Sequence, residues 1–247
     1  KEAEEALLPA IEPTDRPKLF ENHSIIKMRM GEIAGYRGRY EEGEASIRAA
    51  ISVLRRHDSK WECEAWGQLA MIGLHQKDHE LAWQTARKAR ALADRTDTEV
   101  WKIGARWLLS EALIQRAAAT GSEQPLSEAH GLMMQVLQRS RETGGLRYEA
   151  DYLTTWARWH AQAKELREAE CSARDALEIA ERCQYRLNEA QIHNLLAFIA
   201  LAKDEIDEAR GHVDEALRCA HCDGPPYTYR AAMAEAQRLA GIISARQ

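Results

Sequence analysis

The sequence predicts an all-α protein built as a solenoid of helix hairpins, and three observations lead to this prediction. Ala, Leu, Glu and Arg are abundant, whereas the 247 residues include only 6 prolines and 2 phenylalanines. Good helix formers therefore dominate and strand formers are scarce. A short polar turn that leads to a small residue recurs with a period of about 40 residues. Apolar residues follow each turn at helical spacing.

The repeat is clearest at the small residue that follows each turn. These residues lie 39, 47, 40 and 40 positions apart, and they are Gly43, Ala82, Ala129, Ala169 and Ala209. The spacing of 47 reflects a seven-residue insertion at 118 to 124. Two helical turns later, on the same face, come Ala50, Ala89, Val136, Ala176 and Ala216. A small residue also precedes each turn, at Gly31, Ala70, Ser110, Ala157 and Ala197. Such residues let neighbouring helices approach closely.

The elements follow from this register in chain order. The predicted helix pairs are 17 to 37 with 41 to 56, 59 to 76 with 79 to 94, 98 to 119 with 126 to 142, 147 to 163 with 166 to 182, and 186 to 203 with 206 to 222. Because the chain begins at Lys1 within a helical pattern, residues 2 to 12 are predicted to end a truncated preceding unit. A closing helix is predicted over 226 to 242, opened by Pro225 and Pro226. A single pair cannot bury its apolar face, so we expect the pairs to stack.

This pattern resembles the tetratricopeptide repeat (TPR), with small residues at its eighth, twentieth and twenty-seventh positions. The seventeenth position is held by Tyr40, His79, Leu126, Leu166 and Ile206. The units exceed the consensus of about 34 residues by roughly six and lack its terminal proline. The resemblance implies a right-handed TPR-like α-solenoid that forms one domain over 1–247. Its expected parts are a repeat end at 1–15, repeats at 16–57, 58–96, 97–144, 145–184 and 185–224, and a capping helix at 225–247.

The resemblance also implies a binding site. In TPR proteins, the first helix of each pair lines a concave groove, chiefly through its second, fifth, ninth, twelfth and thirteenth positions. In this register the expected ligand-binding residues are Glu32, Tyr36, Glu64, His75, Trp107, Glu111, Gln115, Asp151, Arg158, Gln162, Gln191 and Asn194. Met28, Met71, Thr154 and Phe198 occupy further positions of the same face. The paired Lys and Asn of the carboxylate clamp are missing, so capture of an acidic peptide C-terminus is not expected.

Seven tryptophans are many for so polar a chain. Most are expected to fill the space between helices, and one or two could serve as aromatic anchors of an interface. Trp156, at the seventh repeat position, is predicted to lie in the core. Trp107, at the fifth, is predicted to face the groove.

The sequence contains none of the common motifs of catalytic or cofactor-binding sites. The chain has neither a phosphate-binding glycine loop nor a GxSxG or HExxH motif. The pair Cys219 and Cys222 lacks the further ligands that a structural zinc needs. Glu111 with His75 or Arg158 is the best acid–base set available. We therefore expect no enzyme activity, no metal and no cofactor.

Charge and cysteine usage limit the partners and the compartment. The net charge of -5 is mild, and its signs are interspersed, which disfavours nucleic acid as a partner. Five cysteines without framework spacing indicate a reducing compartment, so a cytoplasmic location is expected. The strongly apolar stretch from Leu195 to Ala202 is too short to cross a membrane.

The segment from Arg218 to Arg230, with the sequence RCAHCDGPPYTYR, and the segment LLPAIEP at 7 to 13 resemble the repeat arrays of bacterial STAND NTPases. This resemblance implies a sensor arm of a NACHT-type or NLR-like signalling ATPase, as in bacterial defence. Its partners would be a protein or peptide ligand and the NTPase domain of the same longer chain. Two alternatives stay open: a free-standing TPR scaffold, and the small-molecule or peptide-sensing arm of an ATP-dependent transcription activator.

Overall fold

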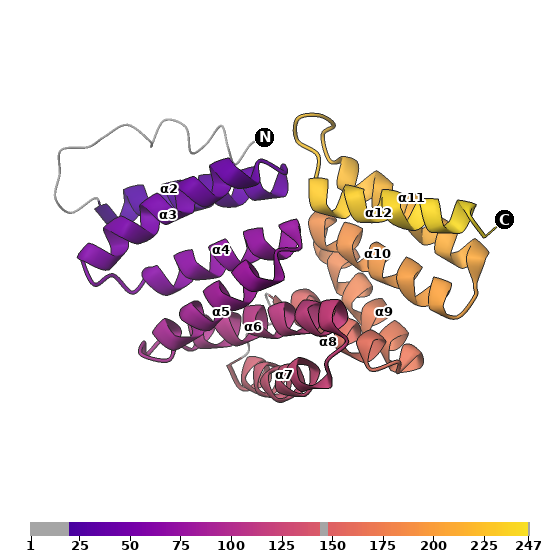
Figure 1. Cartoon of the computed structure of the whole chain (residues 1–247), viewed down its shortest axis with the longest axis horizontal. Coiled ribbons are helices and arrows are strands. Elements are labelled where there is room, and N and C mark those ends of the chain that lie inside the picture. The colour runs from indigo at the N-terminus through magenta and orange to yellow at the C-terminus, as the bar shows by residue number, and fades with distance from the viewer. Residues whose placement is uncertain (1–19, 144–147, 247) are drawn as a thin grey trace. The chain divides into compact units, whose positions relative to one another are not determined.

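The structure, a computed structural model, describes residues 20–143 and 148–246, which form helices and no strand (Figure 1). The helices are α2 (Phe20–Tyr36), α3 (Tyr40–Arg56), α4 (Glu62–Gln76), α5 (His79–Ala93), α6 (Glu99–Thr120), α7 (Glu123–Thr143), α8 (Glu149–Gln162), α9 (Leu166–Cys183), α10 (Arg186–Ala202), α11 (Ile206–His221) and α12 (Arg230–Ser244). By its internal contacts the chain divides into two compact units, Lys1–Gly121 and Ser122–Gln247.

The first unit contains two helix hairpins and a further helix. Helix α2 packs against α3, α4 packs against α5, and α6 lies against both α4 and α5. The core between the first two hairpins is formed by aliphatic side chains from α2, α3 and α4, which include Met28, Ile47, Leu54, Leu69 and Ile72. Trp61 and Trp66 pack against this core from its edge.

The second unit repeats this plan. Helix α7 packs against α8, which forms a hairpin with α9, and α10 forms the next hairpin with α11. Helix α12 covers α10 and α11, as predicted for a closing helix. One core lies between α8, α9 and α10 and another between α10, α11 and α12, the latter around Val213, Leu239 and Ile243.

The small residues of the repeat are all buried, as the register predicts. The closest example is the glycine pair of the first hairpin. A Cβ atom added to Gly43 would lie 2.7 Å from the carbonyl oxygen of Gly31 and 2.9 Å from Cδ1 of Ile72. Helices α2 and α3 therefore pack backbone against backbone at this point, which explains why glycine occupies both positions.

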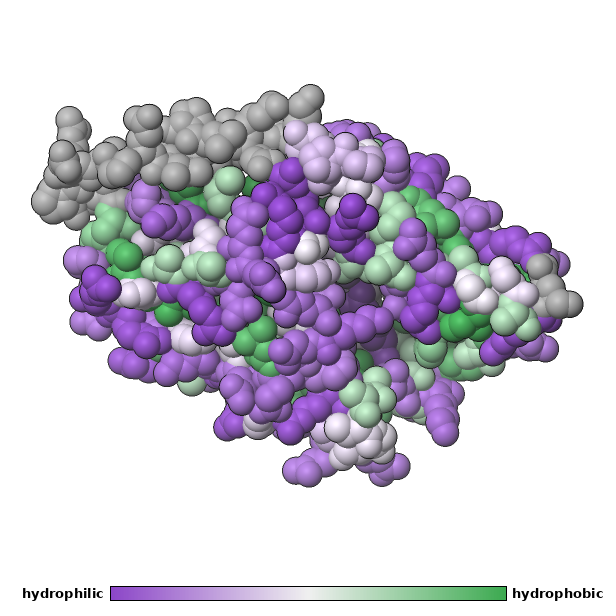
Figure 2. All heavy atoms as spheres, turned by 45° about the horizontal axis from the view of Figure 1, so that its top comes forward, coloured by the Kyte–Doolittle hydropathy of each residue, from purple (hydrophilic) through white to green (hydrophobic). Residues whose placement is uncertain are grey.

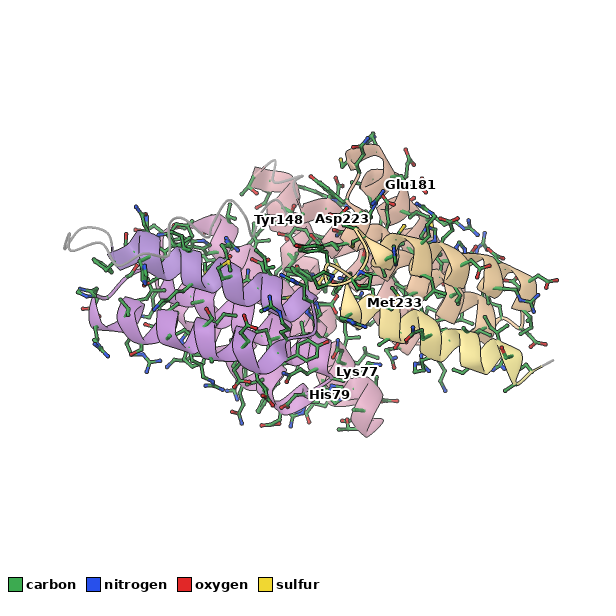
Figure 3. The ribbon with its side chains drawn as sticks, turned by 90° about the horizontal axis from the view of Figure 1, so that it is seen from above. Lys77, His79, Tyr148, Glu181, Asp223 and Met233 are labelled. Atoms are coloured by element: carbon green, nitrogen blue, oxygen red, sulfur yellow. The ribbon has the colours of Figure 1, made fainter. Side chains whose placement is uncertain are left out.

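The turns inside the hairpins share one geometry. A residue one or two positions after the first helix has a positive φ, at Gly38, Lys77, Lys164 and Asp204. The next backbone N–H then donates to the carbonyl five residues earlier, as in Asp78 to Gly73 at 2.9 Å and Glu165 to His160 at 2.9 Å. This bond closes the first helix and redirects the chain. Figure 3 labels Lys77 at such a turn.

The predicted and observed elements differ at the insertion and at the start of the closing helix. The insertion at 118 to 124 is mostly helical, because α6 continues to Thr120 and α7 begins at Glu123. The closing helix was predicted to begin at Pro226, which is wrong, because residues 225 and 226 belong to a turn with a cis peptide bond and α12 begins at Arg230. The predicted repeat end at 1–15 lies outside the described residues, and the pairing of 98–119 with 126–142 stays a prediction.

Candidate binding face on the first helices

In the first unit, two predicted site residues lie around one arginine. Arg29 of α2 donates to Glu32 at 2.9 Å within its own helix and to Glu64 of α4 at 3.4 Å. Burial raises the pKa of the Glu32 carboxyl, and the nearby Arg29 guanidinium partly offsets this effect. The cluster contains two carboxylates and one cation, so this part of the face is acidic.

Two more predicted residues meet at the C-terminal ends of the same helices. The rings of Tyr36 and His75, both at the thirteenth repeat position, have centroids 5.2 Å apart. The hydroxyl of Tyr40 donates to the backbone carbonyl of His75 at 3.5 Å. The register thus places Tyr36 and His75 side by side, half-buried, where two helices of one face meet.

Helix α6 contributes Trp107, Glu111 and Gln115, which differ in access. Trp107 and Gln115 are half-buried. Glu111 is only 3% exposed, although its ninth repeat position predicts an open groove residue. A charge reversal at Glu111 would therefore act on the fold, and we do not treat this carboxylate as a ligand contact.

In the second unit, the predicted residues form polar bridges between successive helices. The side-chain amide of Asn188 donates to Asp151 at 2.7 Å. Arg158 of α8 donates to Gln191 of α10 at 2.9 Å, and Gln191 donates to the hydroxyl of Tyr229, just before α12, at 2.6 Å. These contacts fix neighbouring helices to one another, so part of the predicted site has a structural role.

Asn194 and Gln162, the remaining predicted residues, take no part in these hydrogen bonds. Asn194 is 6% exposed and donates to the backbone carbonyl of Ala232, so α12 covers it. Its side-chain oxygen has no hydrogen-bond partner in the described part of the chain. Gln162, at the end of α8, is half-buried.

The most accessible apolar group of this face is Phe198, at the ninth repeat position of α10. It is 38% exposed, while the other large hydrophobic side chains in the central part of α10 are buried. The repeat register predicts that Phe198 lies on the first-helix face. It does not predict that the side chain is exposed there. On the side seen in Figure 2, hydrophilic side chains predominate and apolar ones occur in small separate patches.

The prediction that Trp156 lies in the core is wrong. Its ring is half-buried and stacks on Trp159, with centroids 5.2 Å apart and planes at 11°. His130 of α7 and His160 border this pair, and the indole N–H of Trp159 donates to the carbonyl of Leu126 at 2.8 Å. The tryptophans thus fill the contact between α7 and α8 at its surface.

Two observations bear on metal and thiol chemistry. Among the described residues, no three His, Cys, Asp or Glu side chains are grouped so as to hold a metal ion. Burial raises the pKa of the Cys219 thiol to about 11, which disfavours the reactive thiolate.

Within residues 20–143 and 148–246, no helix has both the length and the apolar character to cross a membrane.

Comparison with known proteins places the fold. No protein-family model and no curated protein matches the sequence. Among solved structures, a thermophilic TPR protein of Thermus thermophilus is similar, with a TM-score of 0.60 and 20% identity over 90% of this chain and 99% of the other. BtubC (BKLC) of P. vanneervenii gives 0.56 and 19%, over 83% of this chain and 90% of the other.

The apo form of RapI gives a TM-score of 0.53 and 14% identity, over 94% of this chain and 65% of RapI. These identities are low, so the likeness concerns the fold. Together with the buried repeat positions and the recurring turns, it shows that the chain is an all-α protein with a TPR-like solenoid fold.

Proposed function

We propose that the chain is a non-catalytic recognition module that binds a protein or peptide through the first-helix faces of its hairpins. The observation that carries the proposal is Phe198, an aromatic ring 38% exposed on a helix whose core face is well packed. Aromatic side chains are favoured as anchors in protein interfaces. Arg158, at the same repeat position of α8, supplies a half-buried cation on the same face.

The polar residues around this anchor have a definite role in the proposal. The ladder from Arg158 through Gln191 to Tyr229 holds α8, α10 and the start of α12 in place. A face that is ordered before binding loses less conformational entropy when the partner docks. Arg158 and Gln191 would then hydrogen-bond the partner at the rim, and Phe198 would provide the buried contact.

The finer proposal is that the module is the cytoplasmic sensor arm of a bacterial STAND-type signalling ATPase. Its support is the resemblance of residues 218 to 230 to the ends of such repeat arrays. It predicts that the gene encodes a P-loop NTPase upstream of Lys1. A free-standing scaffold is the second candidate, because the similar Thermus protein is matched over 99% of its solved chain.

The binding proposal is tested with two matched variants. Peptides are selected from a displayed random library on the immobilised chain, and their affinities are measured for the wild type, Phe198→Ala and Met134→Ala. Met134 is 51% exposed in the same unit but lies on the second helix α7. Loss of an interface anchor costs about 2 kcal/mol or more, so we expect at least a tenfold weaker affinity for Phe198→Ala alone. Equal affinities for all three proteins would refute the assignment of this face.

A further inference from the structure

The contact between α5 and α6 contains an arrangement that the binding face does not use. Trp83 of α5 is half-buried, and two guanidinium groups lie against its ring. The Cζ atom of Arg87 is 4.8 Å from the ring centroid, and that of Arg116, from α6, is 4.1 Å away. Figure 3 labels His79, the first residue of α5, which marks the end of the helix that carries this ring.

The indole orders both guanidinium groups but uses none of their hydrogen-bond donors, because a cation–π contact engages the face of the guanidinium. Within the described residues, Arg87 has no hydrogen bond or ion pair. Arg116 has a single ion pair, with Glu80 at 3.9 Å, and its side chain donates no hydrogen bond. The donors of Arg87 therefore have no acceptor in the described part of the chain, and the guanidinium of Arg116 faces only the Glu80 carboxylate, at 3.9 Å.

The positive charge of the two guanidinium groups is only partly compensated, by Glu80. At the other end of the same contact, Arg106 pairs with Asp94 at 2.7 Å and Arg90 pairs with it at 3.6 Å. Glu80, the acid beside Trp83, is exposed and accepts from Gln84 at 2.8 Å, closer than Arg116.

We propose that Arg87, Trp83 and Arg116 form a binding site for a phosphate monoester. Two guanidinium groups match the charge of a dianion, and each can donate two parallel hydrogen bonds to phosphate oxygens. A carboxylate carries a single charge, which one guanidinium already neutralises. The site lies in the first unit, on α5 and the C-terminal part of α6, and it shares no residue with the contacts proposed for the partner, Arg158, Gln191 and Phe198.

The role of Glu80 follows from the same geometry. Its carboxylate is the anion nearest to Arg116 and would compete with the phosphate for that guanidinium. Removing its charge should therefore strengthen phosphate binding. A purely structural role of the Arg–Trp–Arg group does not predict this gain.

The site is tested by NMR titration of the full chain with O-phosphoserine, inorganic phosphate and glutamate, following the Trp83 indole N–H and the Arg87 and Arg116 Nε–H signals. We expect saturable shifts with phosphoserine, at least tenfold weaker binding for Arg87→Gln and Arg116→Gln, and at least threefold tighter binding for Glu80→Gln. Arg167→Gln, which removes an exposed cation of α9, is the control and should bind as the wild type does. Inorganic phosphate that binds as well as phosphoserine would identify the phosphate group itself as the ligand, whereas weaker binding would indicate a phosphorylated side chain.

Circular dichroism spectra establish that each variant is folded, and Glu80→Gln changes only an exposed side chain. Unchanged phosphoserine binding in both arginine variants would overturn the proposal. Glutamate binding as tight as phosphoserine binding would overturn the assignment of a dianion. A Glu80→Gln variant without gain would show that the two guanidinium groups do not act as the site.

Discussion

The close approach of α2 and α3 gives the sharpest stability prediction. Alanine at Gly43 places a Cβ atom 2.7 Å from the carbonyl oxygen of Gly31 and 2.9 Å from Cδ1 of Ile72. Because the nearest neighbour is backbone, the helices must move apart, and overpacking of this kind costs about 1–3 kcal/mol. Replacing glycine by alanine within a helix also contributes about 1 kcal/mol of helix propensity in the opposite direction.

A second glycine of the same unit separates these two effects. A Cβ atom at Gly104, in α6, would meet nothing within 4 Å, so Gly104→Ala should gain the propensity without the clash. The free energy of unfolding should therefore be about 1–3 kcal/mol lower for Gly43→Ala than for Gly104→Ala. Thermal and urea unfolding followed by circular dichroism measures this difference, at roughly 2–4 °C per kcal/mol. Equal stability of the two variants would refute the helix packing described above.

Three further predictions concern buried groups. Burial lowers the pKa of His193 to about 4 and also lowers that of its neighbour His212, so the unfolded state binds more protons below about pH 6.5. The free energy of unfolding should fall by about 1 kcal/mol from pH 7 to pH 5, after allowance for solvent screening, and His193→Gln should reduce this slope in urea titrations. Glu111→Lys should destabilise the first unit by roughly 3 kcal/mol in thermal unfolding, because it places an ammonium group at a buried site arranged around a carboxylate. An unfolding transition identical to that of the wild type would contradict the burial of Glu111. Ala169→Trp, at a fully buried contact between α8 and α9, should cost about 1–3 kcal/mol in the same assay.

The sequence predicted the helices well because two local signals define them. Period-3.6 apolar patterns identify the helix, and the short polar turns before Gly43, Ala82, Ala169 and Ala209 identify its start. The predicted second helix 41 to 56 is observed as Tyr40–Arg56, and the predicted 206 to 222 as Ile206–His221. The prediction was weaker at Pro226, because a proline fits the first turn of a helix and a tight turn equally well.

The candidate site was predicted less well, because access depends on what covers a residue. Glu111 and Asn194 occupy face positions of the repeat, yet both are buried. Asn194 is covered by α12, which lies 38 positions further along the chain at Ala232. The contacts of Arg158 and Gln191 likewise join helices of successive repeats, and no local spacing rule specifies such pairs. The half-buried ring of Trp156 packs against the rings of Trp159 and His130, and the contact with His130 depends on how α7 packs against α8.

The central claim is that partners bind on the first helices, and site-specific photocrosslinking tests it most directly. A photoreactive amino acid is placed at position 198 on α10 or at the exposed position 178 on α9, and the chain is irradiated with a selected peptide. We expect a crosslinked product at position 198 that excess unlabelled peptide removes, and little product at position 178. Equal or stronger crosslinking at position 178 would contradict it.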